Sequence, residues 1–162
     1  MRMPLLIGTV IALGLLAATL PISATEQDRD MLTFAGQQHP ALERPLNDFL
    51  GRLRTIPRFD IPNTANYKGY RAAWEVRDSK LYLASFSAAT NGQPFSVAFL
   101  FPGRRLPFFA DWYSGTVHVV RGRETLAQGY YTYERITALR ITNGVVTTTN
   151  EMRNIREDKL NK

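Results

Sequence analysis

The chain has no cysteine, and this absence excludes several common arrangements at once. No disulfide can form, no thiol can act as a nucleophile or zinc ligand, and no lipid can be attached to a cysteine after an export signal. Histidine is almost as scarce, with two among 162 residues. We therefore expect a fold held together by its apolar core alone, without a metal site and without a cofactor.

The first 24 residues have the order of features that is typical of a secretory signal peptide. Arg2 precedes an apolar run from Leu5 to Leu20, and Pro21 and small residues ending at Ala24 follow. The run is slightly longer than the usual apolar core of about 15 residues, so an uncleaved membrane anchor is the alternative. Pro21 would end a helix where the peptidase needs extended chain, which favours cleavage. We expect a protein of the periplasm or the extracellular space, with membrane contact only if the segment is not cleaved.

The sequence divides into four predicted segments. They are a signal peptide over residues 1–24, a flexible lead-in over 25–40, a single β-rich domain over 41–151 and a charged tail over 152–162. The roughly 138 residues after the signal peptide suit one domain and are too few for two ordinary ones.

Basic side chains outnumber acidic ones, which gives a formal net charge of +6. An exported protein of this charge meets phosphate-bearing lipids, anionic envelope polymers and acidic protein surfaces, so we expect no nucleic-acid partner. The same charge also suits a small domain that only has to remain soluble. Candidate partners are therefore another protein or an anionic polymer of the envelope.

From Tyr67 onward apolar and polar residues alternate, which predicts short strands. Residues 70–76 and 80–88 form a predicted hairpin with Trp74 in the core, and Asn143-Gly144 predicts another hairpin. Further strands are expected over 95–101, with Phe99 in the core, and over 108–113, 116–121, 126–133, 136–142 and 145–150, with a turn at 122–124. Seven or eight short strands predict a mainly β fold, an antiparallel barrel or sandwich.

One amphipathic helix is predicted before the strands, from Glu43 to Arg54. Leu46, Phe49 and Leu50 recur at helical spacing, with acidic residues early in the segment and arginines late, as the helix dipole favours. We expect this helix to pack across an open end or a face of the sheet.

Only Glu75, Asp111 and His118 stand out as catalytic candidates, and each has a plainer explanation. Glu75 and Asp111 could converge from different strands as the carboxylate pair of a glycoside hydrolase. The alternative is that Glu75 pairs with a cross-strand arginine and that Asp111 accepts backbone bonds at a strand end. His118 could join Ser114 and Asp111 in a trio, but it equally suits a partly buried position in a strand.

The sequence also suggests a binding surface. Trp112 and Tyr113 are neighbours in an extended segment, where successive side chains point to opposite faces, so one of the two is expected to be exposed. If the arginines of the chain converge on one end of the fold, they form an anion-binding patch. The arginines occur in three groups, at Arg52, Arg54 and Arg58, at Arg104 and Arg105, and at Arg121 and Arg123.

Three stretches, Tyr67–Val76, Lys80–Leu83 and Ala110–Gly115, carry the motifs GYxxxWEV, KLYL and DWYSG in that order. In these motifs the chain resembles an uncharacterised family of bacterial β-rich proteins. The resemblance covers roughly half of the chain after the signal peptide. It implies a shared β domain with no assigned activity, and it carries over no catalytic residue.

These observations predict an exported binding domain without enzymatic activity, such as an inhibitor or immunity-type partner of an envelope-directed enzyme or toxin. One alternative is an envelope carbohydrate hydrolase that uses Glu75 and Asp111, which requires both carboxyl groups in one cleft, about 5 to 10 Å apart. The other alternative is a carrier for a hydrophobic ligand, which requires a partly empty barrel interior.

Overall fold

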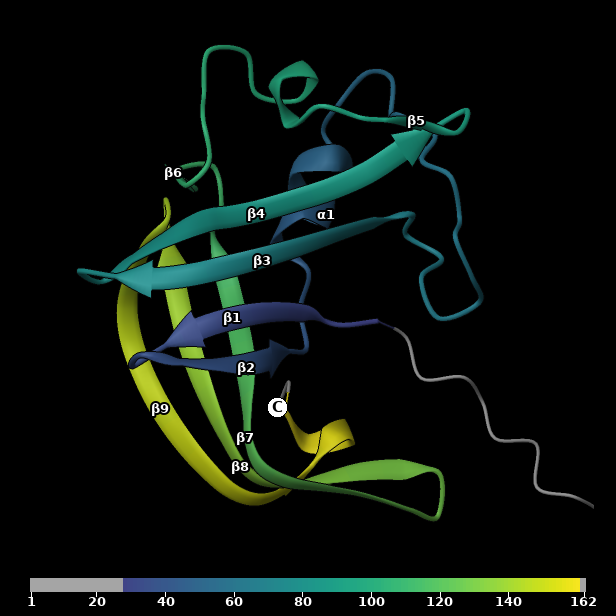
Figure 1. The fold of residues 1–162 in the computed structure, drawn as a ribbon. Coiled ribbons are helices and arrows are strands. Elements are labelled where there is room, and N and C mark those ends of the chain that lie inside the picture. Colours follow the sequence, from purple (N-terminus) through teal and green to yellow (C-terminus); the bar gives the residue numbers. More distant parts are fainter. Residues whose placement is uncertain (1–27, 161–162) are drawn as a thin grey trace, which may run out of the picture.

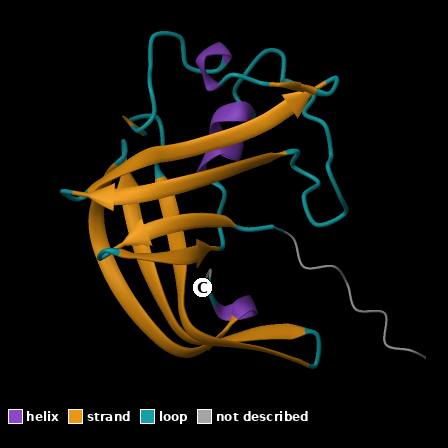
Figure 2. Ribbon diagram, viewed as in Figure 1, coloured by secondary structure: helices purple, strands orange, loops and turns teal. Residues whose placement is uncertain are grey.

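The structure of the chain is a computed structural model, and it describes residues 28–160. The predicted signal peptide lies outside the described residues. Within them, nine strands and three short helices form a mainly β fold (Figure 2). The predicted fold class is confirmed at this level.

Two groups of strands run across one another, with β1 to β4 crossing the direction of β7 to β9 (Figure 1). The strands are β1 (Asp30–Phe34), β2 (Gln37–Ala41), β3 (Tyr70–Arg77), β4 (Lys80–Thr90), β5 (Gln93–Pro94), β6 (Phe108–Phe109), β7 (Gly115–Ala127), β8 (Tyr130–Thr142) and β9 (Val145–Arg156). The helices are α1 (Pro45–Leu50) and the two 3₁₀ turns η1 (Val97–Phe99) and η2 (Glu157–Lys159).

All nine strands belong to one sheet, whose order is β3-β1-β2-β7-β8-β9-β4-β5, with β6 beside β4. Because β3 also pairs with β4, the pairings run around a cycle. Two links of this cycle are single residue pairs, Ala41 with Val119 and Lys80 with Val145, and β1 runs parallel to β3. The sheet is therefore not a clean barrel, and its pairing is not wholly antiparallel.

Both predicted hairpins form. β3 and β4 meet at Asp78-Ser79, and β8 and β9 meet at Asn143-Gly144, with positive φ at both turn residues in each case. This geometry matches the right-handed twist of the flanking strands. Trp74 is 1% exposed, so its predicted place in the core is confirmed.

The strand predicted over residues 95–101 is wrong. β5 ends at Pro94, and the hydroxyl of Ser96 accepts a hydrogen bond from the Ala98 N–H, which starts the 3₁₀ turn η1. Local side-chain bonds of this kind compete with strand pairing. Phe99, predicted to lie in the core, is 77% exposed.

The prediction of a flexible lead-in over residues 25–40 is wrong for much of this segment, because the strands β1 and β2 lie largely within it. The reason is a buried polar contact: Asp30 is 0% exposed, forms an ion pair with Lys68 and accepts a hydrogen bond from the Trp74 indole N–H at 2.8 Å. These partners come from later in the chain, so the local sequence shows little sign of them. Leu32, on the same strand, is fully buried in the core.

The turn predicted at residues 122–124 is also wrong. β7 continues through these residues as a bulge, and the chain reverses at Gln128-Gly129 instead. Gly122 has φ +85, a conformation that suits a bulge as well as a turn. The first residues of the predicted charged tail belong to β9.

The helix α1 spans six residues, so the longer amphipathic helix predicted from Glu43 to Arg54 is not confirmed. Arg44 is extended at its N-terminal end, because Glu43 is bonded to β7 and does not continue the helix. Leu46 and Leu50 are buried in the main core, which lies between α1 and the crossing strands. A second, smaller apolar cluster forms around Val120 and Ile136.

Candidate functional site

The structure gives the two predicted catalytic carboxylates partners of their own. Both oxygens of Asp111 accept hydrogen bonds from Arg104, at 3.0 and 3.1 Å. Glu75 lies 4.0 Å from Arg77 on its own strand, not beside a cross-strand arginine. Neither carboxylate lines any of the three hollows described below.

His118 is 4% exposed and is paired with Glu43, a partner that the sequence analysis missed. Its Nδ1 lies 2.6 Å from one Glu43 oxygen, and its backbone N–H donates to the other at 2.5 Å. Both oxygens of Glu43 therefore fix the chain before α1 to β7. A surface hollow of about 450 Å³ lies beside this contact, lined by Leu42, Glu43, Arg44, Asn47, Asp48, Tyr113, Gly115 and Thr116.

The trio of Ser114, Asp111 and His118 is not bonded as a trio, because each member has another partner. The Ser114 hydroxyl accepts a hydrogen bond from the Asn143 N–H at 2.9 Å. Asp111 and His118 are paired as described above. No hydrogen bond links the three side chains among the described residues, so the arrangement needed to activate a serine is not in place.

Trp112 and Tyr113 both pack into the fold, and the expected exposure of one of the two is seen only in part, at the half-buried Trp112. Tyr113 is 3% exposed and donates to the Thr116 carbonyl at 3.1 Å, and burial, with a smaller contribution from Glu43, raises the pKa of its hydroxyl. Trp112 is half-buried, with its ring 4.7 Å from the ring of Phe101. Aromatic packing of this kind stabilises the fold rather than offering a surface.

The three arginine groups do not converge. Arg52 donates to the Trp112 carbonyl at 3.4 Å, and the Arg104 guanidinium lies 6.0 Å from the Trp112 ring, so two groups meet there. Arg105 is exposed. The third group lies farther along β7. This strand begins at Gly115, three residues after Trp112, and Arg121 is six residues farther along it, about 20 Å from Gly115. We call the first region the Trp112 corner, defined by Phe49, Phe101, Arg104, Asp111 and Trp112.

A second region combines backbone irregularity with charge. On β7, residues 122 and 123 form the bulge between the Arg121 and Glu124 pairs, and on β9 Asn154 has φ +49. The three neighbouring strands curve together at this line (Figure 1). We call it the strand bend, defined by residues 121–124 of β7, 133–135 of β8 and 153–154 of β9. Bulges that cross adjacent strands often lie beside binding or active sites.

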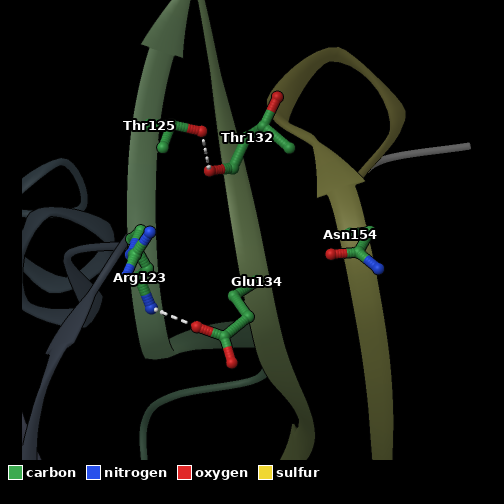
Figure 3. Close-up of a pocket in the computed structure, with 5 residues that line it drawn as sticks. All are labelled: Arg123, Thr125, Thr132, Glu134 and Asn154. Carbon is green, nitrogen blue, oxygen red and sulfur yellow. Dashed lines mark hydrogen bonds between the residues drawn. The ribbon is translucent and has the colours of Figure 1, made fainter.

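Glu134 occupies the middle of the strand bend. Its carboxylate accepts a hydrogen bond from the Arg123 N–H at 2.9 Å (Figure 3). A Cβ atom on Gly122 would lie 2.9 Å from the same carboxylate, so a larger residue here would displace the end of the Glu134 side chain besides adopting a positive φ of +85. Side chain and bulge therefore fix one another.

Two surface hollows meet at the strand bend and share Glu134 and Asn154. In Figure 3 the side chains of the first come from three adjacent strands. Its volume is about 430 Å³, and it is lined by Arg123, Thr125, Thr132, Glu134 and Asn154. The second has about 400 Å³ and is lined by Glu134, Arg135, Arg153 and Asn154. Both are lined by polar side chains, with one arginine at the first hollow and two at the second.

Three arginines form a row across the strand bend, because Arg121 is directly opposite Arg135, and Arg135 is directly opposite Arg153. Directly opposite side chains share a face, with Cβ atoms about 5 Å apart, and like charges in this arrangement destabilise a sheet. Glu151 lies 3.9 Å from Arg121 and 3.1 Å from Arg153. Within residues 28–160, Arg135 has no ion pair, and its Nε is buried without a hydrogen-bond partner.

The other buried polar atoms without partners among the described residues fall into two sets: those of Tyr133, Thr137 and His39 lie on strands of this region, and those of Trp112 and Asn66 lie elsewhere. Thr137, two residues from Arg135 on the same face of β8, is 2% exposed, and its hydroxyl has no partner among the described residues. His39 on β2 has an unpartnered Nε2, and burial, followed by the charge of Arg121, lowers the pKa of its imidazole. An unpaired buried polar group costs about 1 to 3 kcal/mol, so such groups usually mark a water or ligand position. The strand bend is therefore the candidate functional site.

Comparison with protein-family models, with curated proteins and with solved structures finds no match for this chain. In the described part of the chain, no three acidic, histidine or cysteine side chains are grouped to hold a metal ion. No helix in that part is long and apolar enough to cross a membrane.

Proposed function

We propose that this chain is an exported binding domain, of the periplasm or the extracellular space, that recognises another protein by adding a partner strand to β9. The observation that carries the proposal is the free edge of β9. This strand pairs with β8 over nearly its whole length. Within the described residues, its other edge is engaged at its start alone, where Val145 pairs with Lys80 and the Val146 N–H donates to the Ser79 carbonyl at 2.8 Å. Among the described residues, no strand covers that edge from Thr147 onward.

An unpaired strand edge offers a row of N–H and C=O groups to an incoming strand. The side chains from Thr147 to Glu151 are all exposed, and three successive threonines favour extended chain. The register shift near Arg140 and the positive φ of Asn154 limit the regular edge to about residues 148–153. This length suits a short partner strand.

The direction of the edge groups follows from the hairpin. The two-residue turn at Asn143-Gly144 makes the residues that flank it a hydrogen-bonded pair. Counting in twos along β8 then makes Ala138 and Asn150 another such pair. Thr149, next to Asn150, therefore directs its N–H away from β8, toward the free edge.

Strand addition obtains its affinity from main-chain hydrogen bonds and its specificity from side chains. Glu151 and Arg153 flank the middle of the free edge and would select a partner strand with complementary charges. An inhibitor or immunity-type protein that blocks an envelope-directed enzyme or toxin suits this mode, because it has to recognise one folded protein.

The test separates backbone from side chain at Thr149. A photo-crosslinking amino acid at position 149, with one at exposed Arg140 on the central strand β8 as control, would identify the partner in cells. With the purified partner, Thr149→Pro, which removes the outward N–H, should weaken binding about tenfold or more. Thr149→Ala keeps that N–H and should bind within about twofold of wild type.

Circular dichroism would establish that both variants keep the β fold. Crosslinking at 149 but not at 140, with loss of binding in the proline variant alone, supports strand addition. Equal binding by the two variants would show that β9 does not receive a strand.

A further inference from the structure

The arginine row of the strand bend carries positive charge that the described residues do not neutralise. We propose that the strand bend is a binding site for a phosphate group, held by Arg135 at the centre of the row and by Arg121 and Arg153 on either side. This proposal does not depend on the binding mode proposed for β9.

The charges at the strand bend favour an anion with two negative charges. Arg121 and Arg153 share the carboxylate of Glu151 within 4.0 Å, and Arg135 has no carboxylate at this distance among the described residues. Glu134 also lines the second hollow, but it accepts a hydrogen bond from the backbone N–H of Arg123, whose own side chain adds a positive charge. Glu124 at the end of the bulge is paired with Arg29, so these two charges cancel. The four arginines and the two other glutamates leave two positive charges, which matches a phosphate monoester.

The unpartnered atoms favour an acceptor-rich ligand. Arg135 Nε can only donate a hydrogen bond, and the Thr137 hydroxyl can donate one. His39 donates or accepts according to its tautomer. A cation would be repelled by the arginines, and a neutral ligand would leave their charges unpaired. Of these three groups, Arg135 lines the second hollow together with Arg153, and a phosphate bound there offers acceptor oxygens to its Nε.

The shape of the site favours phosphate over carboxylate. Guanidinium groups bind phosphate and carboxylate oxygens in pairs, and three arginines in a row can contact more oxygens than the two of a carboxylate. The hollow beside Arg135 and Arg153 has about 400 Å³, which also admits part of a larger molecule that carries the phosphate. Inorganic phosphate and a lipid head group share this chemistry.

Isothermal titration of the purified protein with inorganic phosphate, in a phosphate-free buffer of low ionic strength, tests the proposal. Arg135→Gln should weaken binding about tenfold or more, since a hydrogen-bonded charge is lost. Arg140→Gln is the matched control, because Arg140 lies on the same strand, is exposed and has no ion pair among the described residues. It should bind within about twofold of wild type.

The melting temperature serves as a second measurement on the same variants. Arg135→Gln should keep or raise the melting temperature without ligand, because it removes like-charge repulsion. A variant that loses phosphate binding while it keeps its stability supports a binding role for Arg135. Loss of stability together with binding would assign Arg135 a structural role and overturn the proposal.

Vesicles distinguish the source of the phosphate. Phosphatidylcholine vesicles with and without phosphatidic acid present a phosphate monoester in a membrane. Arg135-dependent binding to phosphatidic acid vesicles, without binding of inorganic phosphate, supports a lipid head group as the ligand. Absence of binding to both phosphate and vesicles, or binding that is equal in Arg135→Gln and Arg140→Gln, overturns the proposal.

Discussion

The Trp112 corner and the strand bend contain the same types of charged residue and use them in opposite ways. At the Trp112 corner, Arg104 binds both oxygens of Asp111 and also donates to the Phe109 carbonyl at 2.9 Å. At the strand bend, Arg135 stands between two other arginines and has no ion pair among the described residues. Arginine at the first region stabilises the fold, whereas arginine at the second region opposes it.

The difference teaches where to look for function in a chain without matches. Side chains whose polar atoms the fold itself pairs need no ligand to explain them. Locally unfavourable arrangements, such as a row of like charges, are expected where a site binds something from outside. Arg104 at the Trp112 corner is therefore explained by its partners in the fold, although Trp112 Nε1 is buried there without a hydrogen-bond partner among the described residues. Arg135 at the strand bend has no such explanation, which is why the binding proposal concerns this region.

The largest expected effect on the free energy of unfolding comes from Asp30, a buried charged residue that, like Arg104, has its partners within the fold. Asp30→Ala leaves Lys68 buried without its carboxylate, at a cost of about 3 to 5 kcal/mol. Asp28→Ala is the control, because its ion pair with Arg71 is exposed and should contribute less than about 1 kcal/mol. Urea unfolding measures both free energies. Equal losses of stability in the two variants would show that the buried ion pair contributes no more than the exposed one.

A smaller loss is expected at the bulge of the strand bend. Gly122→Ala and Gly129→Ala both place a side chain at positive φ, but only Gly122 has Glu134 in contact distance of the added Cβ. We expect a loss of about 1 kcal/mol for Gly129→Ala and about 1 to 2 kcal/mol for Gly122→Ala, because the Glu134 side chain has to move and loses its bond from the Arg123 N–H. Thermal unfolding compares them. If both variants lose the same stability, Glu134 and the bulge are not coupled.

The two arginines should respond with opposite signs. Arg104→Gln loses an ion pair and a bond to a carbonyl, so its free energy of unfolding should fall by about 1 kcal/mol. Arg135→Gln relieves like-charge repulsion, so its free energy of unfolding should stay constant or rise by about 0.5 kcal/mol. Urea unfolding at low ionic strength, where surface charge effects are largest, measures the contrast. A fall in both variants would remove the distinction between the two regions.

The smallest expected effect concerns pH. Since burial and Arg121 lower the pKa of His39 below 6.5, the unfolded chain binds a proton more readily than the folded one. The contribution of His39 to stability is therefore present above pH 6.5 and is lost as the pH falls below it. In the variant His39→Gln, the free energy of unfolding should depend less on pH below 6.5 than in wild type. An NMR titration that places the His39 pKa at or above 6.5 would contradict the expected burial.

The hairpins show how much of the fold could be predicted from the sequence. Five two-residue turns have positive φ at both positions. Two of them, Asn91-Gly92 and Asn143-Gly144, have the Asn-Gly sequence that favours this geometry and can be predicted from it. Ala35-Gly36 and Gln128-Gly129 have the same geometry without asparagine at the first position, so β1, β2 and the true end of β7 were missed. The turns with the strongest local preference were predicted, and those with a weaker composition signal were not.

The arginine row shows why the candidate site was only half predicted. Arg121 and Arg123 were expected to bind an anion, but Arg135 and Arg153 were not connected with them. Regular counting from Asn143-Gly144 would place residue 152 opposite Arg135, and the register shift near Arg140 places Arg153 there instead. A single extra residue in β9 determines which of its side chains share a face of the sheet with Arg135, and no pattern in the sequence marks the position of that residue.

Thermal unfolding of wild type, Arg104→Gln and Arg135→Gln, with and without inorganic phosphate, shows whether the arginine row binds a ligand. Ligand that binds only the folded state raises the melting temperature, by about 3 to 6 °C near saturation for a domain of this size. The account predicts this rise for wild type and for Arg104→Gln, and its absence for Arg135→Gln. A rise of equal size in all three proteins, or in none of them, would contradict a phosphate site at the strand bend.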